Sequence, residues 1–268
     1  MKPWLQMILR GLNVEMRRIG MKDRVLHDRV ELSYKDIKKF FDDRGENDAL
    51  KSKYNYVLFQ DQEPELAVRR DAQEKEKIGA LLSLSRPLRV LDIGCGIGRW
   101  GEYLLERGAY YVGIDGSEKM IERAETNLKQ YASKRLTAGF FQDLLSILEE
   151  LGEKDTFDLI LVNGVFMYLN DEDFEQSLQD IKKVAGQSCE LYIKESMGIK
   201  ERLTLNKFFS EGLNQHYSAI YRSIEEYRTS FEKAFAAECV LVQKGMLFDA
   251  DLRNHAETTD YYFVWKRR

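Results

Sequence analysis

The chain has 268 residues, of which 44% are apolar, and a formal net charge of −4. This length suits one elaborated domain, and a chain without a basic excess is not expected to bind nucleic acid. Its three cysteines and three histidines are scattered, and no apolar run approaches the ~20 residues of a membrane span. We therefore expect a reduced, cytoplasmic protein without a metal site, whose oligomeric state the sequence leaves open.

Residues 1–20 carry apolar side chains at helical spacing, with basic residues between them. Three interpretations stay open: a helix packed on the core, an upstream start ahead of Met21, and an amphipathic helix lying on a surface. A signal peptide is not expected, because the apolar run LQMIL is short and no small-residue cleavage site follows it.

Residues 21–86 are rich in charge and are predicted to be helical. Ser33 has the N-cap position of one helix, with Asp36 at its third position, and Pro64 suits the first turn of a second helix. Between these helices lies an aromatic loop, KSKYNYVLFQDQ. The first 86 residues are thus expected to form a helical N-terminal extension.

From residue 88 the pattern changes to short apolar runs that alternate with helical segments. The expected strands are 88–93, 110–115, 136–141, 157–163 and 189–195. The expected helices are 98–108, one that follows Ser117, 144–151 and 171–184. This alternation predicts a parallel sheet with helices on both faces. Further along, the expected elements are an irregular helical stretch at 198–220, a helix at 223–237, and two strands, 239–248 and 260–268, that pair antiparallel at one sheet edge.

The stretch VLDIGCGIGRW places Gly94, Gly96 and Gly98 between a predicted strand and a predicted helix. Glycines let the backbone turn sharply and approach a ligand closely, as nucleotide-binding turns do. Arg99 stands where the dinucleotide pattern GxGxxG has its third glycine, which weakens the interpretation as an NAD site.

Polar residues end successive predicted strands: Asp115, Asp143 and Asn163. The carboxyl ends of parallel strands meet at one edge of the sheet, so these side chains are expected to converge on a ligand. Asp115 is placed to accept from ribose hydroxyls and Asp143 from an exocyclic amine. Asp92 lies inside the first strand, where N–H groups of the turn are expected to satisfy its carboxylate.

Together these motifs resemble those of class I S-adenosylmethionine-dependent methyltransferases, over about residues 88–195. VLDIGCGIGRW resembles their first motif, VGIDGSEKMIERA the second, and FQDL and FDLILVNGVFMYL the third and fourth. The resemblance implies an α/β, Rossmann-like sheet of seven mostly parallel strands, with helices on both faces, an antiparallel last strand and a helical N-terminal extension. It also implies a methyltransferase domain at 87–268 with a substrate cover inserted at about 196–222, and residues 1–86 as a cofactor lid.

The resemblance implies S-adenosyl-L-methionine as cofactor. The cofactor-binding residues that it implies are Arg70, Gly94, Gly96, Gly98, Arg99, Asp115, Gly116, Met120, Asp143, Leu144 and Asn163. Arg99 would pair with the methionine carboxylate; the alternative is a solvated arginine in the first helical turn. Tyr54, Tyr56, Gln60 and Arg70 would close over the methionine end; the alternative for Arg70 is an i,i+4 pair with Glu74 on a solvated helix.

Methyl transfer to an alcohol or an ammonium needs a proton acceptor. Glu195, which ends the fifth predicted strand, is the first candidate, and the alternative is a salt bridge with Lys194 or a loop partner. His216 is the second candidate, and its alternative is an ordinary partly buried histidine. The same segment supplies the expected substrate-binding residues Tyr217, Tyr221 and Arg222.

The sequence thus favours a methyltransferase that acts on an O or N atom of a small molecule, with a sugar or nucleotide-sugar-type metabolite as one candidate acceptor. Two alternatives stay open. A peptide or protein N-methyltransferase is one, because IKES and AIYR resemble a segment of protein N-terminal methyltransferases. A non-catalytic binding protein that keeps the fold is the other.

Overall fold

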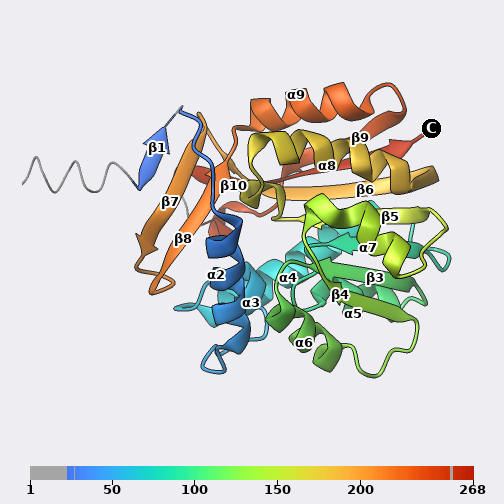
Figure 1. The fold of residues 1–268 in the computed structure, drawn as a ribbon, viewed down its shortest axis with the longest axis horizontal. Coiled ribbons are helices and arrows are strands. Elements are labelled where there is room, and N and C mark those ends of the chain that lie inside the picture. Colours follow the sequence, from blue (N-terminus) through green and yellow to red (C-terminus); the bar gives the residue numbers. More distant parts are fainter. Residues whose placement is uncertain (1–22, 27, 254–255) are drawn as a thin grey trace, which may run out of the picture.

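The computed structural model describes residues 23–26, 28–253 and 256–268. The interpretations of residues 1–20, and two of the three histidines, lie outside these described residues. Within them a central sheet is sandwiched between helices, and a second, smaller sheet lies at one end beside the first long helix (Figure 1).

Seven strands form the central sheet, in the order β4-β3-β2-β5-β6-β10-β9. They are β2 (Arg89–Ile93), β3 (Tyr110–Asp115), β4 (Lys134–Ala138), β5 (Phe157–Asn163), β6 (Ala185–Gly198), β9 (Cys239–Met246) and β10 (Thr258–Arg267). The pairings among β2 to β6 are parallel, whereas β10 runs antiparallel to both β6 and β9. The predicted seven-stranded sheet with an antiparallel last strand is therefore confirmed.

Helices cover both faces of this sheet. The helices are α2 (Tyr34–Glu46), α3 (Asn55–Leu58), α4 (Pro64–Gly79), α5 (Arg99–Leu105), α6 (Glu118–Asn127), α7 (Leu144–Glu150), α8 (Asp171–Val184) and α9 (Ile224–Phe235), with short 3₁₀ turns η1 (Phe141–Asp143), η2 (Phe166–Tyr168) and η3 (Ala250–Leu252). Side chains of α7, α8 and α9 pack on one face, and those of α4, α5 and α6 pack on the other. The predicted caps are confirmed: Ser33 accepts from the N–H of Asp36, Ser117 accepts from that of Met120, and Pro64 begins α4.

The small sheet corrects the prediction of a helical stretch at 198–220. Its antiparallel strands are β1 (Arg24–Leu26), β7 (Leu203–Ser210) and β8 (Gln215–Tyr221), in the order β1-β7-β8. The register of β7 against β8 shifts between Leu205 and Phe208, and Lys207 has a φ of 56°. Such a bulge interrupts the alternation of inward and outward side chains that identifies a strand. Because β1 adds a strand from the N-terminal extension, that extension is not purely helical either.

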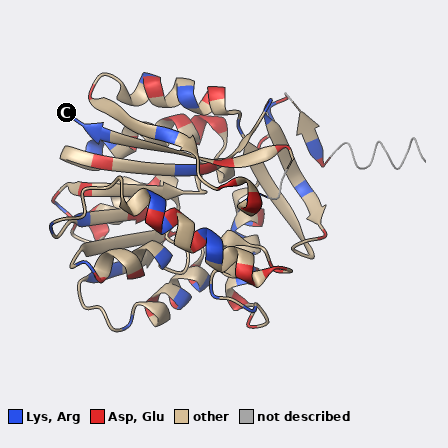
Figure 2. Cartoon of the chain, turned by 180° about the vertical axis from the view of Figure 1, so that it is seen from behind, with Lys and Arg blue, Asp and Glu red and all other residues tan. Residues whose placement is uncertain are grey.

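Charged residues of both signs alternate along the helices (Figure 2). Their mixture agrees with the small net charge of the chain. No helix among the described residues is long and apolar enough to cross a bilayer.

Candidate functional site

A cavity of about 580 Å³ lies at the carboxyl ends of β2, β3, β5 and β6. Its size falls within the roughly 300–1,000 Å³ of ordinary ligand pockets. The small sheet, α2 and the loop 57–63 supply further walls. The predicted site residues that line this cavity are Arg70, Gly94, Gly96, Asp115, Gly116, Met120, Asn163, Tyr217 and Tyr221, with Gln60 from the aromatic loop.

The glycine turn after β2 needs its glycines for two reasons. Gly94 and Gly96 have φ values of +73° and +54°, which side-chain-bearing residues rarely adopt. In addition, a Cβ on Gly94 would lie 2.2 Å from Val165 Cγ2, and a Cβ on Gly96 would lie 2.5 Å from Val57 Cγ1. The cavity wall therefore closes directly onto the backbone of the turn.

Asp115 joins the glycine turn to the end of β3. Its carboxylate accepts from the backbone N–H of Gly96 at 2.8 Å and from that of Ser117 at 2.9 Å. Burial raises the pKa of Asp115 to about 6, although both N–H groups act in the opposite direction. This partly exposed carboxylate lines the cavity and keeps acceptor capacity for a ligand hydroxyl.

Two half-buried side chains in the cavity wall carry buried polar atoms that lack hydrogen-bond partners among the described residues. Neither the amide nitrogen nor the amide oxygen of Asn163 has one, and the same holds for Oε1 of Gln142. Buried polar atoms are nearly always paired, so unpaired atoms beside a cavity point to a polar ligand. Sequence reasoning selected Asp143, which is exposed and outside the lining, and missed its neighbour Gln142.

A further cluster of polar side chains in the cavity wall was not predicted from the sequence. Lys194, Ser196 and Asp260 line the cavity from β6 and β10. Ser196 donates to Asp260 Oδ1 at 2.8 Å, and Lys194 Nζ lies 3.7 Å from the same oxygen. The signal for them was the period of 2 in YIKES, which places Lys194 and Ser196 on the face opposite Glu195.

Comparisons with known proteins agree with this arrangement. Residues 90–187 match the family model described as a methyltransferase domain. Over these residues, the chain carries a methyltransferase domain of the class I, S-adenosylmethionine-dependent type. The cofactor of such a domain is S-adenosylmethionine.

The relatives of this methyltransferase domain differ in what they are named for. A ubiquinone biosynthesis O-methyltransferase of Pelagibacter ubique is 36% identical over 98 residues, which cover 36% of this chain and 38% of that protein. Phosphoethanolamine N-methyltransferase 1 of Triticum aestivum is 27% identical over 126 residues, 47% of this chain and 25% of that protein. The chain thus matches less than half of the length of these curated relatives.

Solved structures extend the likeness to most of the fold. Magnesium protoporphyrin IX methyltransferase from Synechocystis, with bound S-adenosylmethionine, has a TM-score of 0.60 at 16% identity and covers 90% of this chain and 100% of its own. An S-adenosylmethionine-dependent methyltransferase from Leishmania major also has a TM-score of 0.60 at 16% identity, and covers 86% of this chain and 82% of its own.

Arg99 lies outside the cavity lining. Only 6% of Arg99 is exposed, and its guanidinium pairs with Asp71 at 3.0 Å and with Glu74 at 2.6 Å. Glu74 also accepts from the indole of Trp100 and from the hydroxyl of Tyr192. Both alternatives for Arg99, a cofactor contact and a solvated arginine, therefore differ from what the structure shows: a buried ion pair that ties α5 to α4.

Arg70 does not form the solvated pair with Glu74 either. It is buried, donates from Nε to the carbonyl of Leu252 at 2.9 Å, and lies 5.1 Å from the ring of Phe248. Burial lowers the pKa of Arg70, and the nearby carboxylate of Asp260 opposes this shift. Arg70 thus lines the cavity beside β10.

The prediction for Asp92 is wrong as to its partner. Its carboxylate accepts from the Tyr111 hydroxyl at 2.6 Å, whereas the turn N–H groups of Gly94 and Cys95 donate to the carbonyl of Ile114. Burial raises the pKa of Asp92 to about 7.

Three further residues expected around the cofactor lie outside the lining: Gly98 packs on Leu128, Leu144 joins the core, and the Tyr56 hydroxyl donates to the carbonyl of Asn47. Tyr54, expected beside Tyr56, also lies outside it.

Glu195 is fully buried and lies outside the cavity lining. Its Oε1 accepts from the N–H groups of Val165 and Phe166 at 2.9 Å, and its Oε2 accepts from that of Met167 at 3.1 Å. Burial raises its pKa to about 7 against these hydrogen bonds. Both oxygens thus hold the turn η2, which is the loop-partner alternative rather than contact with an acceptor.

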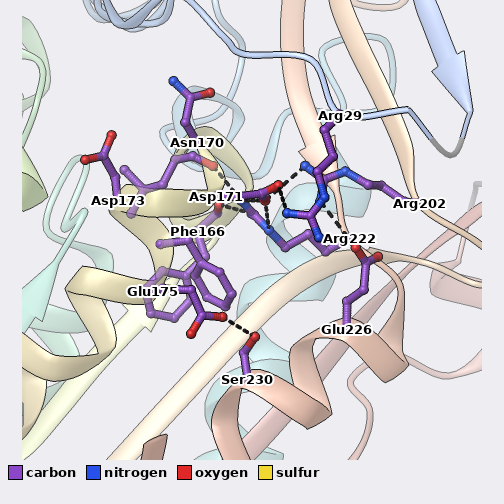
Figure 3. A network of polar contacts seen from close by, with 12 residues as sticks. Arg29, Phe166, Asn170, Asp171, Asp173, Glu175, Arg202, Arg222, Glu226 and Ser230 are labelled. Carbon is purple, nitrogen blue, oxygen red and sulfur yellow. Dashed lines mark hydrogen bonds and ion pairs between the residues drawn. The ribbon is translucent and has the colours of Figure 1, made fainter. Parts of the chain in front are cut away.

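Arg222 holds the same turn through backbone carbonyl groups (Figure 3). It is 2% exposed and donates to the carbonyls of Phe166 and Leu169 and to Asp171 at the start of α8. His216 is exposed outside the lining, with its Nδ1 2.9 Å from the carbonyl of Lys207. Of the three predicted substrate-binding residues, Tyr217 and Tyr221 lie in the cavity wall, whereas Arg222 lies outside it.

Proposed function

We propose that this chain transfers a methyl group from S-adenosylmethionine to an O or N atom of a small molecule. The observation that carries the proposal is Asn163, a half-buried side chain in the cavity wall whose two polar atoms are buried and lack partners among the described residues. It ends β5, and the glycine turn follows the neighbouring strand β2. In open α/β sheets, ligands bind in such a crevice at the carboxyl ends of the strands.

The residues in the cavity wall fit this cofactor. The backbone of Gly94 and Gly96 would border its methionine part, and Oδ1 of Asn163 would accept a hydrogen bond from that part. Asp115 would accept from the ribose hydroxyls, and Met120, fully buried, would pack against the adenine. Since Asp143 is exposed, we assign the contact with the adenine amine to Oε1 of the adjacent Gln142.

The cofactor supplies an activated methyl group on a sulfonium. The remaining task of the protein is to orient the acceptor and to exclude water. The small sheet and α2 enclose the cavity, with Phe41, Phe208 and Tyr217 among its walls. An enclosed site of this kind supports a small-molecule acceptor, and residues 1–86 would contribute the lid through α2 and the loop 57–63.

Several relatives support a small-molecule acceptor and leave its reacting atom open, whereas an 18S rRNA methyltransferase, which matches over 39 residues, does not support it. Their names include an O-methyltransferase of ubiquinone biosynthesis and an N-methyltransferase of phosphoethanolamine. A sugar or nucleotide-sugar acceptor stays a prediction from the sequence.

Calorimetric titration with S-adenosylmethionine and S-adenosylhomocysteine tests the proposal. Native protein is expected to bind both, and Asp115→Ala is expected to lose about 1–3 kcal/mol of affinity, because buried N–H groups and ribose hydroxyls lose their acceptor. This equals about 5- to 150-fold in Kd. Native protein that is folded and binds neither compound would refute the proposal.

A further inference from the structure

Three polar side chains meet on one side of the cavity: Asn163, Lys194 and Asp260. Asn163 lies opposite Lys194 in the pairing of β5 with β6, and Asp260 lies opposite Ser196 in the pairing of β10 with β6. Lys194 and Ser196 are two residues apart on one strand, so their side chains share a face of the sheet. We call these three residues the polar triad.

Lys194 has unused hydrogen-bonding capacity. The residue is 7% exposed, and among the described residues its ammonium has one ionic neighbour, Asp260 Oδ1, at 3.7 Å and beyond hydrogen-bond distance. An ammonium carries three donors, and a buried charge without hydrogen bonds is costly. Gly164 lies beside this ammonium, since a Cβ there would be in van der Waals contact with Lys194 Nζ, at 3.9 Å.

The triad combines the groups that an ionising hydroxyl requires. Asp260 offers a carboxylate, of which Oδ1 already accepts from Ser196. Lys194 and Asn163 offer N–H donors that make no hydrogen bond within the described residues. A carboxylate next to an ammonium suits a neutral O–H that gives up its proton better than a ligand that arrives as an anion, since Asp260 would repel the anion.

The surroundings of the triad are aromatic. Tyr221 is close enough to Asp260 that the carboxylate, together with burial as the larger cause, raises its pKa to about 12. The hydroxyl groups of Tyr217 and Tyr168 form a hydrogen bond of 2.8 Å, and the ring of Phe248 lies beside Arg70. Aromatic walls pack against a flat ring and offer few partners for the many hydroxyls of a sugar.

We propose that the acceptor is a hydroxyl group on an aromatic ring, that Asp260 takes its proton, and that Lys194 and Asn163 stabilise the oxygen anion. This inference rests on the proposed function. The O–H bond breaks and its proton goes to the Asp260 carboxylate. An electron pair of the oxygen forms the bond to the methyl carbon, while the electron pair of the carbon–sulfur bond passes to sulfur. The products are an aryl methyl ether, S-adenosylhomocysteine and a protonated Asp260, which returns its proton to solvent.

Phenols of graded acidity test the role of Asp260. The probes are unsubstituted catechol and 4-nitrocatechol, whose nitro group makes the hydroxyl far more acidic. Asp260→Asn is expected to lower kcat for catechol by about 100-fold or more and to affect 4-nitrocatechol by less than about tenfold, because an ionised hydroxyl needs no base. Asp251→Asn is the matched control: Asp251 is exposed, pairs with Arg69 outside the cavity lining, and its removal is expected to leave both rates unchanged.

The affinity for two nucleosides tests where Lys194 acts. Lys194→Met is expected to lower kcat for both catechols and to leave the Kd values of S-adenosylhomocysteine and 5′-methylthioadenosine unchanged. Weaker binding of S-adenosylhomocysteine alone, which carries the methionine carboxylate, would show that Lys194 holds the cofactor and would overturn its proposed role.

Three further outcomes would contradict this inference or the proposed function on which it rests. Equal losses of kcat with both catechols would exclude Asp260 as the base. Native protein that binds S-adenosylhomocysteine and methylates no phenol would overturn the acceptor class and leave the proposed function intact. Native protein that does not bind S-adenosylhomocysteine would instead refute the proposed function itself.

Discussion

Replacing Arg222 by Met is predicted to destabilise the fold and to leave ligand recognition at the cavity nearly unchanged. Arg222 donates to the carbonyl of Phe166 at 2.7 Å, to that of Leu169 at 2.8 Å, and twice to Asp171 Oδ1, at 3.0 and 2.7 Å. Methionine retains most of the aliphatic stem and removes every donor. The substitution therefore isolates the hydrogen bonds and the ion pair from simple loss of volume.

The expected loss of free energy of unfolding follows from the carbonyl groups and the carboxylate that lose Arg222 as a donor. Each buried carbonyl without a donor costs about 1–3 kcal/mol, and breaking a buried ion pair costs about 3–5 kcal/mol. In the variant, Asp171 still has Arg202 as an ion-pair partner at 3.0 Å, so its carboxylate is not left unpaired. We therefore expect the free energy of unfolding to fall by about 3–5 kcal/mol, equivalent to a Tm lower by about 6–20 °C.

Urea and thermal unfolding measure this loss, and calorimetry with S-adenosylhomocysteine measures recognition. Arg228→Met on α9 is the matched control, because Arg228 pairs with Glu225 and Glu232 on the surface, where such pairs contribute little. A native-like Tm for Arg222→Met, combined with weaker ligand binding, would show that Arg222 belongs to the binding site and that the energetic reasoning is wrong.

Four further predictions concern charge and ligand binding. Burial raises the pKa of Asp171, but Arg222 and Arg202 outweigh burial and hold this pKa below its usual value. The ionised Asp171 therefore stabilises the fold above about pH 4, and this stabilisation is lost as the pH falls further. In urea titrations at acid pH, the difference in free energy of unfolding between native protein and Arg222→Met is expected to shrink. Because burial raises the pKa of Asp115 to about 6, affinity for S-adenosylhomocysteine should be full at neutral pH and weaken below pH 6, and Asp115→Asn should abolish this dependence in calorimetry. Asn163→Leu removes two unpartnered buried atoms and should raise the Tm of the ligand-free protein while reducing the Tm shift caused by S-adenosylhomocysteine; a lower Tm with intact affinity would contradict this. Glu74→Leu leaves Arg99 buried with Asp71 alone and should cost about 3–5 kcal/mol in urea unfolding, which a native-like midpoint would contradict.

The central sheet was predictable because its strands are unambiguous in the sequence. FDLILVN is a largely apolar run, as expected for a strand covered by helices on both faces, and it forms β5 with all of its apolar residues buried. The strand β7 was not predictable in the same way. Its bulge at Lys207 breaks the alternation, so the apolar side chains on either side of the bulge fit neither a strand nor a helix period.

The site was predictable where a strand end alone determines the position of a residue. Asp115 and Asn163 end parallel strands, and both line the cavity. The choice between Glu195 and Lys194 required knowledge of which sheet face opens onto the cavity, and a strand covered on both faces carries no such information. Arg99 was mispredicted because its partners Asp71 and Glu74 lie on α4, whose packing against α5 no local pattern reveals.

The pairing of β1 with β7 has a consequence for the order in which the protein assembles. Arg24 and Leu205 are partners in that pair although roughly 180 positions separate them in the chain. Closing so long a loop costs entropy, and contacts between distant segments are slow to form. We therefore expect this wall of the cavity to form late in folding and, with only three residues in β1, to open first in the native state. Such a local opening would let ligands exchange while the seven-stranded sheet stays folded, and hydrogen exchange at β1 and β7 would report its frequency.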